Sequence, residues 1–353
     1  MEVYGHALSE NFIAKLTRFP EVELWGVLKR SPDTEPRKPC REPGHPSLGP
    51  LGNLPLELLF NVIECLDFRS LLRLMRVSLQ WKVAVEALPA YVALIKHARG
   101  QLNTLGLTGI IKHHTVSALY GALLSQKCAS CFEFGGFLFL PTCERICFTC
   151  LLHNKAYWML PTSMAKECFS LTYAELNTLP ILQAIPGSYF VGSQRTQRFP
   201  IPLVSVKQAK QLANKVHGSA RMTAIKYVES KPVHNEMYHQ LHRASLDPPG
   251  CDLSRVRLKF HPVDDEYCGT AAIRFPYVKA GRADSGRLCR GCEYISRNFD
   301  SLPDDIRAQT VPAGVDKSIP LRAIATRLRS RRGFADHISN CYGVKRLLAQ
   351  EKA

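Results

Sequence analysis

The sequence lacks the long apolar runs that a membrane-spanning helix needs. No stretch of about 18 apolar residues occurs in the chain, so we expect no membrane span. The amino terminus also lacks the pattern of a secretory signal, because Glu2 is acidic and no apolar core follows Gly5. We therefore expect a protein of the cytoplasm, the nucleus or both.

The sequence also lacks the motifs of common enzyme classes. It contains no GxSxG, no P-loop, no HExxH and no GxGxxG. Its cysteine pairs do not follow the order of a RING ligase, which interleaves its ligands across two sites. No internal repeat beyond the recurrence of CxxC provides a solenoid or a propeller. We therefore expect no enzymatic activity and assign no catalytic residue.

Positive charge and cysteine are both abundant. The formal net charge of +16 is compatible with acidic partners or nucleic acid, although the basic residues are scattered along the chain. We interpret the one tight run, from Arg327 to Arg332, as a solvated surface. The 13 cysteines cluster in CxxC pairs, which in an intracellular protein indicates metal sites rather than disulfides.

Three short helices are predicted between residues 51 and 98. Pro55 suits the first turn of the first helix. Asp67 or Ser70 can cap the second helix, and Ser78 can cap the third. Apolar residues recur at helical spacing in the first helix, at Leu58, Leu59, Val62, Ile63 and Leu66.

The first helix has more apolar residues than one inward face needs. Leu56 and Phe60 lie round the helix from Leu58 and Val62. A helix that is apolar on several sides must be covered on several sides. The cover is either the rest of this chain or another protein.

From Leu51 to Trp81 the sequence has the pattern LGxLPxELLxxIxxxLDxxSLLRLxRVSxxW, which resembles the F-box. Leu79-Gln80 departs slightly from it, because the family often has a basic residue there. The alternative is an ordinary helical hairpin within a larger α domain. The resemblance implies docking onto a Skp-type adaptor, which bridges to a cullin–RING ubiquitin ligase. The positions that match the family's docking residues are Leu54, Pro55, Leu58, Leu59 and Ile63.

Two further constellations have the residue types of zinc sites. A CxxC pair followed 15 residues later by a second CxxC pair fits a four-cysteine site, with Cys143 or the weaker His153 as substitute ligands. A later CxxC with a helical HxxxC fits a C2HC site, although a core cysteine and a capping histidine explain that spacing equally well. The predicted ligands are Cys128, Cys131, Cys147, Cys150, Cys289, Cys292, His337 and Cys341.

A second resemblance covers most of residues 51–341. The segment from Gly135 to Arg145, followed by CxxCL, looks like a signature of a large group of fungal F-box proteins, as do the later cysteine pair and the C-terminal HxxxC. This resemblance favours the second zinc site over its alternative. Most members of that group lack an assigned substrate, so it implies the ligase connection and little more.

The fold class predicted is mainly α with small β elements, a three-helix F-box followed by a zinc-stapled α+β region. The predicted divisions are an N-terminal segment with a Pro-rich linker over 1–50, the F-box over 51–98, an α-rich region over 99–250 and a small α+β region over 251–353. The linker itself spans residues 31–50.

Local signals predict further elements. Candidate capping residues precede three helices: Thr115, Thr172 with Glu175, and Ser205 with Gln208. Strands are expected at residues 137–140, 256–260 and 270–275, with a hairpin between 189 and 204. We predict a loop over 298–319, a closing helix over 333–348 and a solvent-facing histidine pair at 113–114.

These features predict a non-catalytic substrate adaptor of an SCF-type cullin–RING E3 ubiquitin ligase. Its partners would be a Skp-type adaptor, a cullin reached through it, and a protein substrate that the sequence does not identify. Two structural zinc ions would hold the rest of the chain together. The alternatives are a zinc-dependent nucleic-acid-binding protein, which is not favoured, and an F-box scaffold that works outside a ligase.

Overall fold

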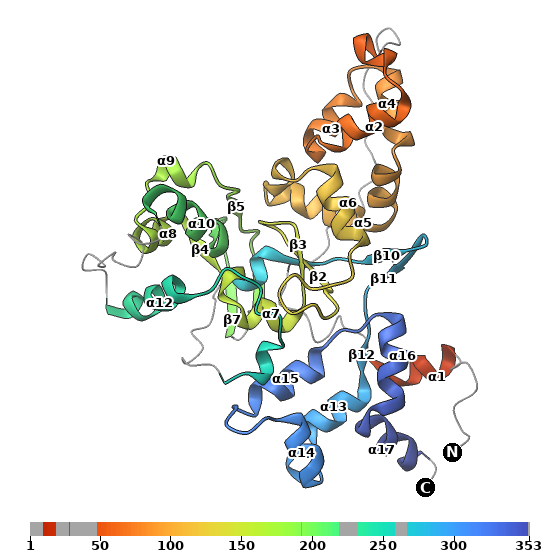
Figure 1. Cartoon of the computed structure of the whole chain (residues 1–353), viewed down its shortest axis with the longest axis vertical. Coiled ribbons are helices and arrows are strands. Elements are labelled where there is room, and N and C mark those ends of the chain that lie inside the picture. Colours follow the sequence, from red (N-terminus) through yellow and green to blue (C-terminus); the bar gives the residue numbers. More distant parts are fainter. Residues whose placement is uncertain are drawn as a thin grey trace.

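The structure is a computed structural model that describes residues 10–18, 28, 48–191, 193–218, 232–257 and 267–351. Helices predominate and are joined by small two- and three-stranded sheets, as predicted. In Figure 1 one group of helices projects from the top of the molecule, while α1 (Glu10–Leu16) and α17 (Tyr342–Gln350) lie near the opposite end. Most of the predicted Pro-rich linker lies outside the described residues.

The projecting group contains the three predicted short helices. Asp67 caps the second helix by accepting from the backbone N–H of Ser70 at 3.0 Å, and Ser78 caps the third by accepting from that of Trp81 at 3.2 Å. Pro55 occupies the N-cap position of the first helix. The elements are a 3-10 turn at Gly49–Asn53, α2 (Leu56–Glu64), α3 (Phe68–Leu74) and α4 (Leu79–Ala87).

A long helix joins this group to the rest of the chain. This helix, α5 (Pro89–Leu107), is kinked at Ala98, so the predicted boundary between residues 98 and 99 falls inside it. One hydrophobic core runs from α2–α4 through α5 and onward to the sheet beyond it. A 3-10 turn (Ile110–His113) and α6 (Val116–Leu124) follow, with Thr115 as the predicted cap.

The predicted solvent-facing pair at residues 113–114 is wrong for one of its members. His113 is exposed, but His114 is buried, and its Nε2 lies 2.5 Å from the carbonyl oxygen of Leu140. Desolvation lowers the pKa of His114, so its ring is neutral at physiological pH. His114 therefore ties the start of α6 to the central sheet.

The central sheet unites distant parts of the chain. Its order is β3-β2-β9, and all neighbours are antiparallel. Because β9 comes from beyond residue 250, the predicted boundary there does not separate two cores. The strands are β2 (Phe137–Phe139), β3 (Glu144–Ile146) and β9 (Ala272–Arg274), and a 3-10 turn (Cys268–Ala271) precedes β9.

The predicted strand at 270–275 is confirmed by β9. The strand expected at 256–260 is not formed at Val256, which ends a 3-10 turn (Leu253–Arg255), while Leu258 and Phe260 lie outside the described residues. Helix α7 (Phe148–His153) and a 3-10 turn (Lys155–Tyr157) follow the central sheet in the chain.

A second core lies under a separate three-stranded sheet of order β4-β8-β5. The predicted hairpin is shorter than expected: it ends at Gln197, because the chain then joins this sheet. The strands of this sheet are β4 (Met159–Pro161), β5 (Leu182–Gln183) and β8 (Pro202–Ser205). The strands of the hairpin are β6 (Gly187–Val191) and β7 (Ser193–Gln197), which pair with each other. The helices are α8 (Thr162–Phe169), α9 (Tyr173–Leu176), α10 (Val206–His217) and α12 (Pro232–Arg243).

Of the two predicted capping boxes, one is confirmed. Thr172 and Glu175 exchange both bonds at the start of α9. Ser205 starts α10 but makes no capping bond, because it also ends β8 and its side chain is buried there. The amide of Gln208 donates instead to the carbonyl oxygen of Pro141 at 3.1 Å.

A third core joins the two ends of the chain. The strand β1 (Thr17–Arg18), which follows α1 (Glu10–Leu16), pairs with β12 (Leu288–Cys289). A two-stranded hairpin, β10 (Tyr277–Lys279) with β11 (Arg282–Asp284), precedes β12. The remaining helices are α13 (Arg290–Arg297), a 3-10 turn (Phe299–Ser301), α14 (Asp304–Thr310), α15 (Ser318–Thr326), α16 (Arg331–Asn340) and α17 (Tyr342–Gln350).

Two predictions for this last region are wrong. The expected loop over 298–319 contains α14, whose first turn carries Asp304 and Asp305, acidic residues that the helix dipole favours. The expected closing helix is two helices, because Cys341 leaves the helical conformation at φ −73° and ψ 116°.

One buried cation fastens α6 to the central sheet. The guanidinium of Arg145 donates to the carbonyl oxygens of Ala122, Gly135, Phe275 and Pro276 at 2.8–3.0 Å. Burial lowers its pKa to about 10, so it remains charged at neutral pH. Its charge is therefore solvated by backbone dipoles drawn from three separate segments.

Replacing Arg145 with Met should cost about 3 kcal/mol or more in the free energy of unfolding, because buried carbonyls lose charged donors. Denaturant unfolding measures this cost. The exposed Arg198→Met is the matched control and should change stability little. Equal effects of the two substitutions would contradict the role of Arg145.

Candidate functional site

Two quartets of cysteine and histidine side chains form in the part of the chain that the structure describes. Within each quartet, all donor atoms lie within 4.8 Å of one another. The sequence predicted the membership of both, although the residues of the second are far apart in the chain. The first quartet is Cys128, Cys131, Cys147 and Cys150, and the second is Cys289, Cys292, His337 and Cys341.

Local backbone structure positions the first quartet. Cys128 and Cys131 lie on a tight turn, which Phe132 closes with a positive φ of 66°. Cys147 is the N-cap of α7, and its Sγ accepts from the backbone N–H of Cys150 at 3.4 Å. Such N–H···S bonds favour the thiolate form, which is the form that binds a metal.

The spacing of the sulfur atoms fits a metal ion. The Sγ atoms of Cys131 and Cys147 are 3.7 Å apart, and all four cysteines of this quartet are free thiols. A disulfide would hold the two sulfurs about 2.05 Å apart. A tetrahedral ion with Zn–S bonds of about 2.3 Å places them about 3.8 Å apart. The arrangement could therefore hold zinc.

The second quartet takes its ligands from a strand, two helices and the break that follows the second helix. Cys289 ends β12, Cys292 lies in the first turn of α13, and His337 lies on α16. The Sγ atoms of Cys289 and Cys341 are 4.0 Å apart, and Cys292 Sγ lies 3.2 Å from Nε2 of His337. The sequence predicted the last pair on one helical face, whereas Cys341 lies at the break between α16 and α17.

Two glycines allow that break to reach the quartet. A Cβ atom on Gly343 would lie 1.9 Å from the carbonyl oxygen of Gly291, and one on Gly291 would lie 2.4 Å from the backbone nitrogen of Val344. The backbones of α13 and α17 therefore touch where these two residues meet. This close approach carries Cys341 to Cys289 and Cys292.

The thiols of each quartet cannot all ionise on their own. Hydrogen bonds from its neighbours lower the pKa of Cys128, whereas the thiols of Cys147 and Cys150 keep their protons because their pKa values are raised. In the second quartet the same effect lowers the pKa of Cys341 to about 3 and raises that of Cys292. A divalent cation would replace the retained protons, and thiolate with imidazole donors suit zinc.

The alternative ligands considered from the sequence stay outside both quartets. Cys143 has a positive φ of 56°, and burial raises its pKa to about 12, so it is a neutral thiol. His153 lies in the last turn of α7 and is not part of either donor set. The two CxxC pairs therefore form the first quartet without Cys143.

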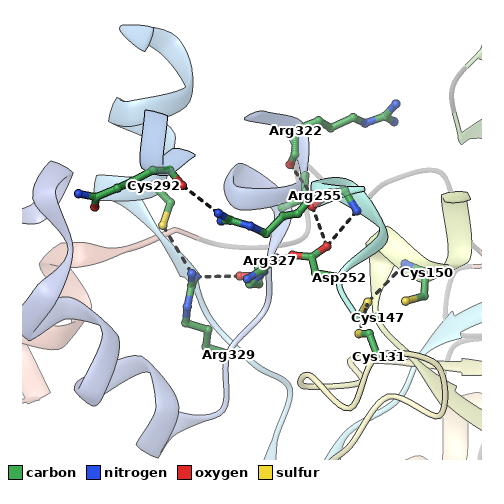
Figure 2. Close-up of polar contacts among 12 residues, drawn as sticks. Cys131, Cys147, Cys150, Asp252, Arg255, Cys292, Arg322, Arg327 and Arg329 are labelled. Carbon is green, nitrogen blue, oxygen red and sulfur yellow. Dashed lines mark hydrogen bonds and ion pairs between the residues drawn. The ribbon is translucent and has the colours of Figure 1, made fainter. Parts of the chain in front are cut away.

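Basic residues connect the surroundings of the two quartets (Figure 2). Arg327 forms an ion pair with Asp252. Arg329 donates to Cys292 Sγ at 3.7 Å and to the carbonyl oxygen of Arg327 at 3.3 Å. The predicted solvated surface is therefore wrong for these two arginines, which are half-buried. A cation beside Cys292 would also offset the negative charge of a metal–thiolate centre.

A third candidate site is the apolar outer surface of α2–α4. Leu54 is 36% exposed and Leu58 is 51% exposed, whereas Leu59 and Ile63 are only 3% and 1% exposed. The last two face the chain's own core, which leaves Leu54, Pro55 and Leu58 as the accessible docking residues of the prediction. Other exposed aliphatic residues between Leu51 and the end of α4 are Leu51, Leu56, Val62, Leu72, Val77, Leu79 and Val83.

Comparison with known families assigns a domain to the segment that contains these helices. The family model of the F-box domain matches residues 51–92, which include all of α2–α4 and the start of α5. No curated protein and no solved structure matches the chain. An F-box domain implies an adaptor that binds a Skp-type subunit. No helix among the described residues is long and apolar enough to cross a membrane.

Substitutions at neighbouring cysteines test the ligand assignment. The native protein should carry two zinc ions, and Cys147→Ser should lose one of them, because a serine hydroxyl is a poor zinc ligand. Metal analysis of the purified chain measures this. Cys143→Ser is the matched control and should keep both ions. Loss of zinc from Cys143→Ser, with none from Cys147→Ser, would contradict the assignment.

Removal of zinc should unfold the chain beyond about residue 125. Structural zinc contributes about 10–16 kcal/mol of apparent folding energy in small peptides, and each quartet joins segments that are separate in the chain. Chelation followed by circular dichroism and limited proteolysis measures the loss. Unchanged ellipticity and protease resistance in the metal-free chain would refute this expectation.

Proposed function

We propose that the chain is a substrate-recognition adaptor of an SCF-type cullin–RING E3 ubiquitin ligase. The observation that supports this most is the uncovered apolar surface of α2–α4 within the F-box domain. Adjacent helices of a soluble chain seldom expose so many aliphatic side chains together unless a partner covers them. A Skp-type adaptor is the partner that an F-box domain implies, and a cullin would be reached through it.

The exposed surface of α2 can bind a partner without disturbing the chain's own core. Leu58 and Val62 are four residues apart, so they share one outward face of the helix. Leu59 and Ile63 lie on the inward face and hold α2 against α6 and its neighbours. The same short helix therefore serves two functions: its inner face anchors the module, and its outer face remains available.

The zinc-held remainder would position the substrate. A four-ligand quartet closes the coordination sphere of the metal and leaves no position open for water or substrate, so the ions would be structural. Such an adaptor needs no catalytic group of its own. It would accelerate ubiquitin transfer by raising the effective concentration of the substrate at the ligase.

Two other functions fit parts of the chain less well. A scaffold that uses the F-box outside a ligase would show the same exposed surface. A nucleic-acid-binding protein would gather basic and aromatic residues on one face. Among the described residues, the strongly exposed aromatic side chains come instead from separate parts of the chain, namely Phe132, Tyr173 and Phe199.

Charged substitutions on the outer face of α2 test the proposal. Leu58→Asp combined with Val62→Asp should abolish co-purification with a co-expressed Skp-type adaptor, because two carboxylates would be buried without partners at the interface. The control is Val216→Asp with Val256→Asp, two valines that are similarly exposed outside the F-box. Undiminished association of the α2 variant, with normal zinc content, would refute the assignment.

A further inference from the structure

A basic cleft lies between the β10–β11 hairpin and the start of α16. It has a volume of about 1070 Å³ and extends to Ile13 of α1 and to Thr17 and Arg18 of β1. In Figure 1 the hairpin projects sideways from the body, and α16 lies below it with α1 alongside. The cleft is separate from both metal quartets and from the surface of α2–α4.

Cations outnumber anions in the lining of the cleft. Six basic side chains line it against two acidic ones, Asp284 and Asp336. Some of these charges are already neutralised, since Arg18 pairs with Glu293 at 2.9 Å. Three have side chains that make no ion pair or hydrogen bond within the described part of the chain: Lys279, Arg282 and Arg332.

Asp284 does not neutralise these three residues. Its carboxylate accepts from the backbone N–H of Gly286 at 3.0 Å and from that of Arg331 at 2.7 Å. These two bonds tie the hairpin to the start of α16 and satisfy the carboxylate within the wall of the cleft. The cleft is therefore preformed, with unpaired cations on both walls.

The hairpin holds two like charges against each other. Lys279 lies directly opposite Arg282 in the antiparallel pair, an arrangement that is destabilising unless an anion lies between them. The turn that joins them places Ala280 at a φ of 48°, which is uncommon for a residue other than glycine. Because both cationic residues are exposed, no packing requirement of the chain explains their pairing.

We infer that this cleft binds an acidic, carboxylate-rich segment of a protein. If the proposed function holds, that segment belongs to the substrate of the adaptor. The unpaired cations come from separate elements, which suits several singly charged carboxylates along an extended peptide better than one phosphate held by converging donors. Single-stranded nucleic acid would need aromatic side chains for base stacking, and among the described residues that line the cleft the only aromatic one is the half-buried Tyr277.

Binding of a short fluorescent peptide of alternating Glu and Ser to the zinc-loaded full chain tests the inference. Fluorescence anisotropy should show an affinity that falls as salt rises, and a peptide with Gln in place of Glu should bind far more weakly. Lys279→Glu with Arg282→Glu should weaken binding about tenfold or more, because two attractions become repulsions. Arg332→Glu should weaken it from the other wall.

The matched control is Arg198→Glu with Lys215→Glu, which makes the same change in charge at exposed sites outside the cleft. This control should bind as the native chain does. Equal affinity of the Glu and Gln peptides would overturn the inference, as would an unchanged affinity of the hairpin variant. Tighter binding of a single-stranded oligonucleotide or a phosphoserine peptide at the same residues would also overturn it.

Peptide binding at the cleft can be measured independently of adaptor binding. Peptide binding that survives Leu58→Asp with Val62→Asp, a variant that loses the Skp-type adaptor, supports the cleft and the F-box assignment separately. If the native chain fails to bind the adaptor but still binds the peptide, the proposed ligase function fails and the cleft stands. If adaptor binding is normal and the peptide does not bind, the cleft fails alone.

Discussion

The structure beyond the F-box depends on eight side chains gathered into two quartets. Each quartet joins segments that are separate in the chain: a turn and the start of α7 in the first, and a strand end, two helices and a helix break in the second. In the first quartet the thiols of Cys147 and Cys150 retain protons that a divalent cation would displace. We therefore expect metal binding to be coupled to folding of the region that would hold a substrate.

The side chains of α2–α4 and those around the quartets are arranged in opposite ways. Around the quartets and Arg145, polar and charged groups are turned inward and satisfied, as the four carbonyl bonds of Arg145 show. On α2–α4, aliphatic groups are turned outward and left uncovered. Since one continuous core connects these regions through α5, a partner bound at the top would be held in a defined position relative to the rest of the chain.

The features that the sequence predicts correctly are those whose physical cause is local. The capping residues Asp67, Ser78 and Thr115 act within three residues of themselves, and the CxxC spacing fixes each sulfur pair on one turn. The predictions are wrong or missing for features whose cause lies far along the chain. The burial of Ser205 in β8 and the break at Cys341 depend on partners far along the chain, as does the pairing of β9 with β2. The signature Gly-Gly of the central segment is explained only by the fold, because a Cβ on Gly136 would lie 2.3 Å from Leu328.

We propose that one chain joins a foreign subunit through its F-box while metal ions hold the remainder in shape. Native mass spectrometry of the chain co-expressed with a Skp-type adaptor tests both parts at once. We expect a single species with the mass of one chain, one adaptor and two zinc ions. Detection of the folded chain without the adaptor and without zinc would contradict this proposal.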